Sequence, residues 1–225
     1  TLLFVPYAAG STVTKSHTLA NGATVEWTDV LVSLFLFADS ANTKGTVKIT
    51  SDRAIVAMAR TYNQAASGTF GQYYPALVAA QGISSSQAAV LPLLKKNTAF
   101  RANVGFQNLG PDSCSGEVKL FNAAGAQVGS TRTLTAAGDK YIQEDDVFTK
   151  AGAGTQDVAY ARVQPTTAGC KAWFFGSVVD AVTNDPTTVP QQLSQAGPFW
   201  IPSIAHAPGA GTSKWRSNIA VVNRS

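Results

Sequence analysis

The sequence predicts an all-β protein made of two related β-sandwich modules, and three observations support this. The stretch that begins at Phe100 recurs from Trp215, 115 positions later, so the chain contains an internal repeat. Short runs of alternating apolar and polar residues are separated by turns rich in Gly, Asn, Asp and Ser, as in sandwiches and barrels. Charged residues make up only 13% of the chain, roughly half the usual fraction. We therefore expect a strand-rich protein with largely neutral surfaces.

The repeat divides the chain into modules. Its offset also pairs Gly10 with Gly125 and the stretch starting at Thr18 with that starting at Thr133. One copy is whole and the other is split between the two ends of the chain. We expect a split module (residues 1–78 with 199–225), a complete module (residues 90–190) and a linker at 191–198.

Each module should contain a similar series of strands. In the split module we expect strands at residues 1–7, 12–19, 46–50, 55–62 and 219–223. Their counterparts in the complete module are residues 117–122, 127–134, 158–164, 172–180 and 104–108. The Pro-containing stretches that start at Val90 and Trp200 introduce the two copies, where Pro suits an edge position.

One element per module breaks the alternation. Thr28 and Asp29 precede an apolar patch, and Asp145 precedes a similar patch in the second copy. Asp and Thr are favourable N-caps, so the pattern predicts a short helix closing one end of each sandwich.

A sandwich that lacks strands exposes unpaired backbone groups and an apolar slot. The two parts of the split module should therefore meet, either within one chain or by filling the slot of a neighbouring chain. A third explanation is that the chain is a segment of a longer array, divided within a module. The residues expected to carry the strand exchange are Trp215, Arg216, Asn218, Ile219, Val221 and Asn223, with Leu3 and Val5 on the opening strand.

The two cysteines, Cys114 and Cys170, both lie in the complete module. A disulfide between them would close a loop of about 55 residues and would be typical of an extracytoplasmic protein; two buried thiols are the alternative. The chain starts at Thr1 without a visible signal peptide, so we expect a processed or excised piece of a longer protein.

The stretch from Arg60 to Gln72 resembles repeat modules of bacterial secreted and surface proteins. The stretches at 99–103, 177–186 and 215–218 fit the same pattern, so the resemblance covers most of the chain. It implies immunoglobulin-like β-sandwiches in tandem, generally without an assigned activity. In those modules the strand containing Trp-Arg-Ser-Asn comes first, whereas here it comes last.

Several residues could carry chemistry, but structural roles explain them better. Arg101 and Arg216 occupy equivalent repeat positions, which favours a role in the fold. The acidic run Glu144, Asp145 and Asp146 fits helix capping better than calcium binding. The polar residues of 180–185 fit a turn.

His17 and His206 are too few and too distant for a zinc site, and no Gly-x-Ser-x-Gly elbow is present. We expect no enzyme activity and no cofactor. The Gly-flanked aromatic loop with Phe70, Tyr73 and Tyr74 could pack at a module interface or bind a glycan or protein.

Charge and hydropathy argue against two classes of function, nucleic-acid binding and membrane insertion. The net charge of +4 is scattered, without the basic stripe that nucleic-acid binding requires. No apolar run approaches the roughly 18 residues of a membrane span. We therefore expect an extracellular structural protein at a bacterial surface, such as a fibre or array subunit that pairs with itself or with adjacent repeats. The competing hypothesis is a surface adhesin or glycan-binding module.

Overall fold

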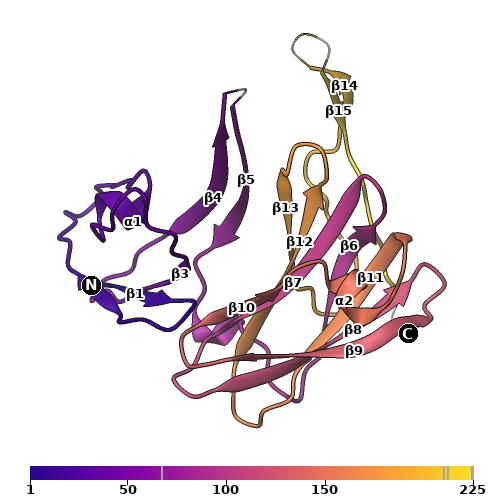
Figure 1. The fold of residues 1–225 in the computed structure, drawn as a ribbon, viewed down its shortest axis with the longest axis horizontal. Helices are drawn as coiled ribbons and strands as arrows, with labels where there is room; N and C mark the ends of the chain where they lie inside the picture. Colours follow the sequence, from indigo (N-terminus) through magenta and orange to yellow (C-terminus); the bar gives the residue numbers. More distant parts are fainter. Residues whose placement is uncertain (67, 210, 212, 224–225) are drawn as a thin grey trace.

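A computed structural model describes residues 1–66, 68–209, 211 and 213–223 of the chain. Ser67, Ala210, Thr212, Arg224 and Ser225 lie outside the described residues, and with them the last positions of the predicted split module. The described residues are mostly β-strands in antiparallel sheets, with two short α-helices, as the sequence predicts (Figure 1). In chain order the elements are β1 (Leu2–Pro6), β2 (Val13–Lys15), α1 (Val30–Ser33), β3 (Gly45–Ile49), β4 (Met58–Ala65), β5 (Gly68–Pro75), η1 (Ala79–Gln81), β6 (Ala89–Lys96), β7 (Phe100–Asn108), β8 (Cys114–Asn122), β9 (Gln127–Ala136), β10 (Tyr141–Glu144), α2 (Val147–Ala151), β11 (Gln156–Pro165), β12 (Ala172–Asp180), β13 (Pro186–Pro190), β14 (His206–Pro208) and β15 (Lys214–Arg216).

The complete module is a sandwich of two four-stranded sheets. One sheet has the strand order β10-β7-β12-β13 and the other β6-β11-β8-β9. Strand β7 pairs along its whole length with β12, so that Phe100 lies opposite Asp180 and Asn108 opposite Ala172. Its other edge pairs with β10. Strand β7 is therefore an interior strand that holds its sheet together.

The core of this module lies between the two sheets. Val104 and Phe106 of β7 face Val118 and Leu120 of β8, and Phe174 of β12 completes the contact; all five are fully buried. The ring centroids of Phe106 and Phe174 lie 5.0 Å apart. The alternation of buried and less buried residues along β8 matches the period of two that a sandwich strand requires.

A disulfide joins the two sheets of the complete module, as the sequence predicts. Cys114 is the first residue of β8, and Cys170 lies just before β12 in the opposite sheet. The bond spans 56 positions of sequence. A disulfide is typical of an oxidising compartment.

Residues 1–78, here called the N-terminal unit, form a smaller structure. Strands β2-β1-β3 make a three-stranded sheet. Leu2, Phe4 and Phe35 form its buried cluster, and the rings of Phe4 and Phe35 lie 5.7 Å apart. Strands β4 and β5 form a separate hairpin, which stands between this sheet and the complete module in Figure 1.

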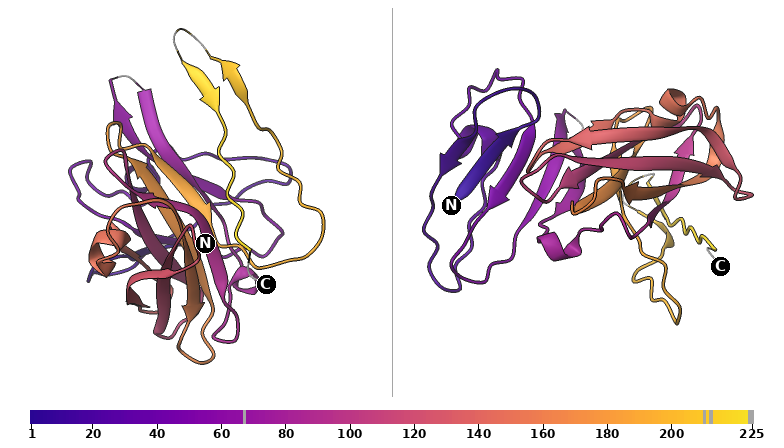
Figure 2. Two further views of the ribbon diagram at one scale, coloured as in Figure 1. Left: turned by 90° about the vertical axis from the view of Figure 1, so that its right-hand side faces the viewer. Right: turned by 90° about the horizontal axis from the view of Figure 1, so that it is seen from below.

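Residues 199–223, here called the C-terminal segment, extend beyond the complete module (Figure 2, left). Strands β14 and β15 pair only with each other in the described chain, with His206 opposite Arg216. The backbone N–H of Ala205 donates to Ser217 Oγ at 2.8 Å, which closes the base of this hairpin. Two extended pieces, residues 199–205 and 217–223, leave from that base. Within a single chain, the C-terminal segment therefore does not complete the N-terminal unit.

Several strand predictions differ from the structure in extent. The predicted strand at 12–19 is reduced to β2, and residues 54–57 and 219–223 are not in strands. Strands β5, β6, β10, β13, β14 and β15 were not predicted. In the complete module β12 pairs with β7. Residues 54–57 are the counterpart of part of β12, and residues 219–223 are the counterpart of part of β7. Within one chain these two segments do not pair with each other.

Both short helices are present, but one predicted cap is wrong. Asp29 caps α1, and its Oδ1 accepts the backbone N–H of Val32 at 3.4 Å. The N-cap of α2 is Asp146, not the expected Asp145. The carboxylate of Asp146 is drawn away to Lys96 Nζ, at 2.6 Å, and to the hydroxyl of Thr149.

Candidate assembly site

The N-terminal unit repeats the complete module with three strands missing. Its order β2-β1-β3 matches β9-β8-β11, and the hairpin β4-β5 matches β12-β13. In the complete module the outer edge of β11 pairs with β6. The equivalent edge of β3 has no strand beside it in the described part of the chain. The described part of the N-terminal unit thus lacks strands equivalent to β6, β7 and β10; residues 24–27, the counterparts of β10, are in no strand.

The missing strands have counterparts in the C-terminal segment. The 115-residue offset aligns Val104 and Phe106 with Ile219 and Val221. Val104 and Phe106 are 0% exposed, whereas Ile219 is 54% and Val221 88% exposed. The same apolar pattern is therefore fully buried in one copy and open to water in the other.

The acceptor side shows the same contrast. Strand β12 aligns with residues 54–62 at an offset of 118 rather than 115, which places Phe174 over Val56 and Gly176 over Met58. Phe174 is fully buried, but Val56 and Met58 are exposed. Soluble proteins seldom leave such apolar positions together on one surface without a partner. We call residues 54–62 with residues 24–27 the acceptor slot.

A polar contact links β7 to the helix cap in the complete module. Asn103 Oδ1 accepts the backbone N–H of Asp146 at 3.0 Å, and Asn103 is buried. Asp146 has φ 46°, and its counterpart Asp29 has φ 47°. The counterpart of Asn103 is Asn218, which is exposed. Both ends of this contact thus recur in the split module but remain apart.

Electrostatics reinforce the cap of the complete module. Burial acts to raise the pKa of the Asp146 carboxyl, but hydrogen bonds from Lys96 and Thr149 outweigh it and hold the pKa below its usual value. The carboxylate therefore stays ionised down to low pH.

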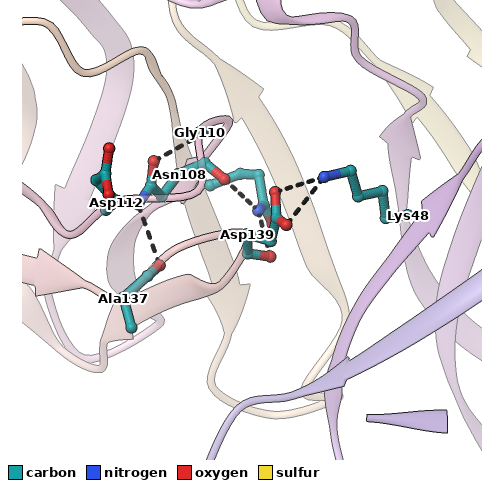
Figure 3. A network of polar contacts seen from close by, with 7 residues as sticks. Lys48, Asn108, Gly110, Asp112, Ala137 and Asp139 are labelled. Carbon is teal, nitrogen blue, oxygen red and sulfur yellow. Dashed lines mark hydrogen bonds and ion pairs between the residues drawn. The ribbon is translucent and has the colours of Figure 1, made fainter.

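A second polar residue of β7 fixes the corner after the strand (Figure 3). The Asn108 amide donates to the carbonyl oxygens of Asp112 at 2.6 Å, Ala136 at 3.3 Å and Ala137 at 3.1 Å. Its Oδ1 accepts the Gly110 N–H at 3.1 Å. Asn108 is 0% exposed, while its counterpart Asn223 is exposed. The corner residue is thus present at both repeat positions and buried at one.

Polar side chains of β3 bind the N-terminal unit to the complete module. Lys48 Nζ lies 2.9 Å from Asp139 Oδ2, as Figure 3 shows, and Thr46 Oγ1 donates to Gln107 Oε1 at 2.8 Å. Gln107 Nε2 in turn donates to the Asp139 carbonyl at 3.0 Å. Residues on the outer face of β3 thus bind the outer face of β7 and the loop before β10.

Aromatic residues complete this joint. The rings of Tyr7 and Tyr141 lie 4.9 Å apart, and those of Tyr74 and Phe175 lie 5.5 Å apart edge to face. Burial raises the pKa of Tyr74 to about 12, and burial with the neighbouring Tyr7 raises that of Tyr141 to about 12. Thr188 Oγ1 donates to the Tyr73 carbonyl at 2.7 Å.

The predicted aromatic loop is in fact strand β5. Tyr74 packs against Phe175 of the complete module, and Tyr73 is 51% exposed. Successive residues of a strand face opposite sides, so Tyr73 and Tyr74 do not form one platform. Phe70 shares the face of Tyr74 and pairs across the hairpin with Asn63.

The strand-exchange residues predicted on β1 do not offer a free edge. Leu3 lies opposite Thr14 of β2 and Lys48 of β3, and Val5 is buried opposite Thr46. Strand β1 is the interior strand of its sheet, so new pairing cannot occur there. In the described part of the chain, the edges of β3 and β4 that correspond to paired edges of β11 and β12 have no strand beside them. Of the C-terminal residues, Trp215 and Arg216 lie in β15, and Asn218, Ile219, Val221 and Asn223 lie beyond it.

Other candidate residues have local structural partners. The Arg101 guanidinium donates to Asn184 Oδ1 at 3.3 Å, and Arg216 donates to the Trp215 carbonyl. Asp180 accepts the backbone N–H groups of Val182 and Thr183, an arrangement that lowers the pKa of its carboxyl.

The two histidines lie in different elements. The His17 ring contacts Trp27 at 5.0 Å, and His206 is in β14. Among the described residues, no three His, Cys, Asp or Glu side chains are grouped as a metal site would require. In the same residues, no helix is long and apolar enough to cross a membrane.

Comparisons with known proteins name no family for this chain. No protein-family model matches it, and no curated protein matches it. The crystal structure of Thermotoga maritima 1070 is similar over 49% of this chain and 97% of its own, with 11% sequence identity and a TM-score of 0.38.

Sequence reasoning named candidate donor residues but did not name most of the candidate acceptor residues. Val56, Met58 and the cap residue Asp29 were not assigned to assembly. The signal was available, because aligning residues 54–62 with β12 places exposed positions over buried ones. That contrast needs the burial of β12, which the sequence alone does not give.

Proposed function

We propose that this protein is a non-enzymatic extracellular structural protein, a subunit of a surface fibre or array whose modules complete one another by β-strand complementation. One observation carries the proposal. The described part of the N-terminal unit lacks strands equivalent to β6, β7 and β10, and residues 199–223 carry the repeat counterparts of β6 and β7. The donor is another copy of the chain or an adjacent repeat.

The contact offers enough apolar area for a stable joint. Trp215, Ile219 and Val221 are all more than half exposed in one chain. Burying each would contribute about 1.5–3 kcal/mol, before any gain from main-chain hydrogen bonds. Donor and acceptor lie at different places on the chain, so the contact is head to tail. A head-to-tail contact that does not close a ring produces a filament.

The chemistry of the chain supports an extracellular setting. The Cys114–Cys170 disulfide suits an oxidising compartment, and the low charge content suits a protein whose surfaces contact other modules. Because β3, β5, Tyr7 and Tyr74 fasten the N-terminal unit to the complete module, the two can transmit load as one piece.

Sedimentation velocity of the 225-residue chain over a series of concentrations tests the proposal. We expect oligomers that grow with concentration. The double variant Ile219→Asp, Val221→Asp should remain monomeric, because two carboxylates cannot enter the apolar slot. Val182→Asp is the matched control: Val182 is 87% exposed in a turn of the complete module, so this variant should assemble normally.

Removing residues 212–225 should likewise leave soluble monomers or unfolded chain. The proposal is wrong if the unchanged chain is monomeric at every concentration. It is equally wrong if the Ile219, Val221 double variant assembles as well as the Val182 control.

A further inference from the structure

We infer that the C-terminal segment acts as a two-pronged clamp on a second copy of the chain, and that the complete module specifies its register. This inference rests on the proposed function and adds the partner and the pairing of individual residues. The first prong, residues 199–205, adds to the free edge of β3. The second prong, residues 217–223, fills the acceptor slot between β4 and residues 24–27.

The β14–β15 hairpin already holds the two prongs as the clamp requires. In the complete module β6 and β7 follow one another but enter opposite sheets. Their counterparts are the two prongs, which leave the β14–β15 hairpin side by side from its base. At that base the Ala205 N–H donates to Ser217 Oγ. The hairpin therefore does not need to open when the prongs separate onto the two sheets of the acceptor.

The first prong has an apolar sequence suited to a sandwich edge. Strand β6 buries Leu91 opposite Ala161 of β11. The repeat aligns Leu91 with Ile201, and Ala161 with Val47 of β3. Trp200 and Ile201 are 88% and 56% exposed. Residues 199–205 thus carry the apolar side chains that an edge strand of this sheet would bury.

Two strand pairings of the complete module define how the second prong lies in the acceptor slot. In one ladder β7 pairs with β12, with Val104 opposite Gly176. In the other it pairs with β10, with Phe106 opposite Ile142. Transferred through the repeat, Ile219 lies opposite Met58, and Val221 lies between Val56 and Val25.

The contact of the second prong with the helix cap gives independent support for this register. The same alignment brings Asn218 Oδ1 to the backbone N–H of Asp29, as Asn103 Oδ1 meets Asp146 at 3.0 Å. Asp29 already has the backbone conformation of Asp146. A shift by one residue would turn Ile219 and Val221 to the opposite face, so apolar and polar contacts demand the same register.

One position differs between the donor and β7. A side-chain carbon at Gly105 of β7 would meet the Ile142 carbonyl and the Phe175 ring. The donor has Ala220 there, and the counterpart of Phe175 is Ala57, so the ring contact is absent in the acceptor slot. Residues 24–27, the counterparts of β10, must move slightly away from Ala220 for the donor to enter.

Cysteine pairing across two chains tests the register. One chain carries Met58→Cys and the other Ile219→Cys, and the mixture is oxidised. The native cysteines are already joined in their disulfide. Residues directly opposite in neighbouring strands are close enough for a disulfide, which also requires that the side chains face one another. We expect a covalent dimer that forms at least tenfold faster than in the control mixture of Met58→Cys with Ala220→Cys, whose side chains face opposite sides.

A second variant tests the cap contact. Asn218→Ala should weaken self-association about fivefold to tenfold, the effect of losing one hydrogen bond to a buried backbone group. Ser217→Ala, at the neighbouring position, removes only the bond to Ala205 at the hairpin base. It should have the smaller effect.

The outcomes separate this inference from the proposed function. If the chain never self-associates, the proposed function fails and the register fails with it. If it self-associates but the Met58 and Ile219 cysteines join no faster than the control pair, the register is wrong while assembly stands. If a single chain carrying both cysteines cross-links internally as a monomer, the slot is filled within one chain and the second-copy partner is wrong.

Discussion

Asn108 and Asn223 place the same residue at the same repeat position in two environments, which makes a sharp test of the fold. In the complete module the Asn108 side chain takes part in four hydrogen bonds to backbone groups at 2.6–3.3 Å. Asn108→Ala removes all four, including the buried bond to the Ala136 carbonyl. At about 1 kcal/mol net per bond, allowing for partial rearrangement, the loss should be about 2–4 kcal/mol of unfolding free energy. Asn223 is exposed, so Asn223→Ala should cost less than about 0.5 kcal/mol in the monomer.

Urea unfolding followed by circular dichroism measures both values at a protein concentration low enough to keep the chain monomeric. Equal costs for the two variants would refute the reasoning, because they would mean that Asn223 is already buried within one chain. A cost below about 1 kcal/mol for Asn108→Ala would show that the corner does not depend on its amide.

Two further predictions concern the disulfide and the joint. Replacing Cys114 and Cys170 together by Ala should lower the unfolding free energy by about 4 kcal/mol, the chain-entropy value for a loop of this length, as measured by urea unfolding; an unchanged midpoint would contradict this. Because burial raises the folded pKa of Tyr74 to about 12, its contribution to stability is fully present below pH 10. It should be lost as the pH rises from 10 to 12, by up to about 1.4 kcal/mol per pH unit. Tyr74→Phe should flatten this part of the stability–pH profile, and a profile that keeps its slope would show that Tyr74 does not titrate at the joint.

Alternation in the sequence predicted several of the strands that lie in the core. Strand β12 begins and ends at its predicted residues, Ala172 and Asp180, and most of β8 was also predicted. These strands bury a continuous apolar face, so their pattern is strong. Strand β5 was read as a loop because Gly68 and Gly71 interrupt it.

The same limits apply to the candidate site. The repeat made the C-terminal segment the candidate strand donor, because its apolar residues copy those of β7. It could not show that β1 is an interior strand, so Leu3 and Val5 were assigned to an edge that β2 and β3 already occupy. Which edges remain free depends on strand order, and strand order is a property of the folded sheet.

The central claim is that residues 217–223 become an interior strand in another copy of the chain. Hydrogen–deuterium exchange of their backbone amides, measured over a series of protein concentrations, tests it most directly. Exchange should be fast in dilute solution, where these residues are in no strand, and should slow by orders of magnitude as the concentration rises. Amides that exchange fast at every concentration, or that are protected even at high dilution, would contradict the claim.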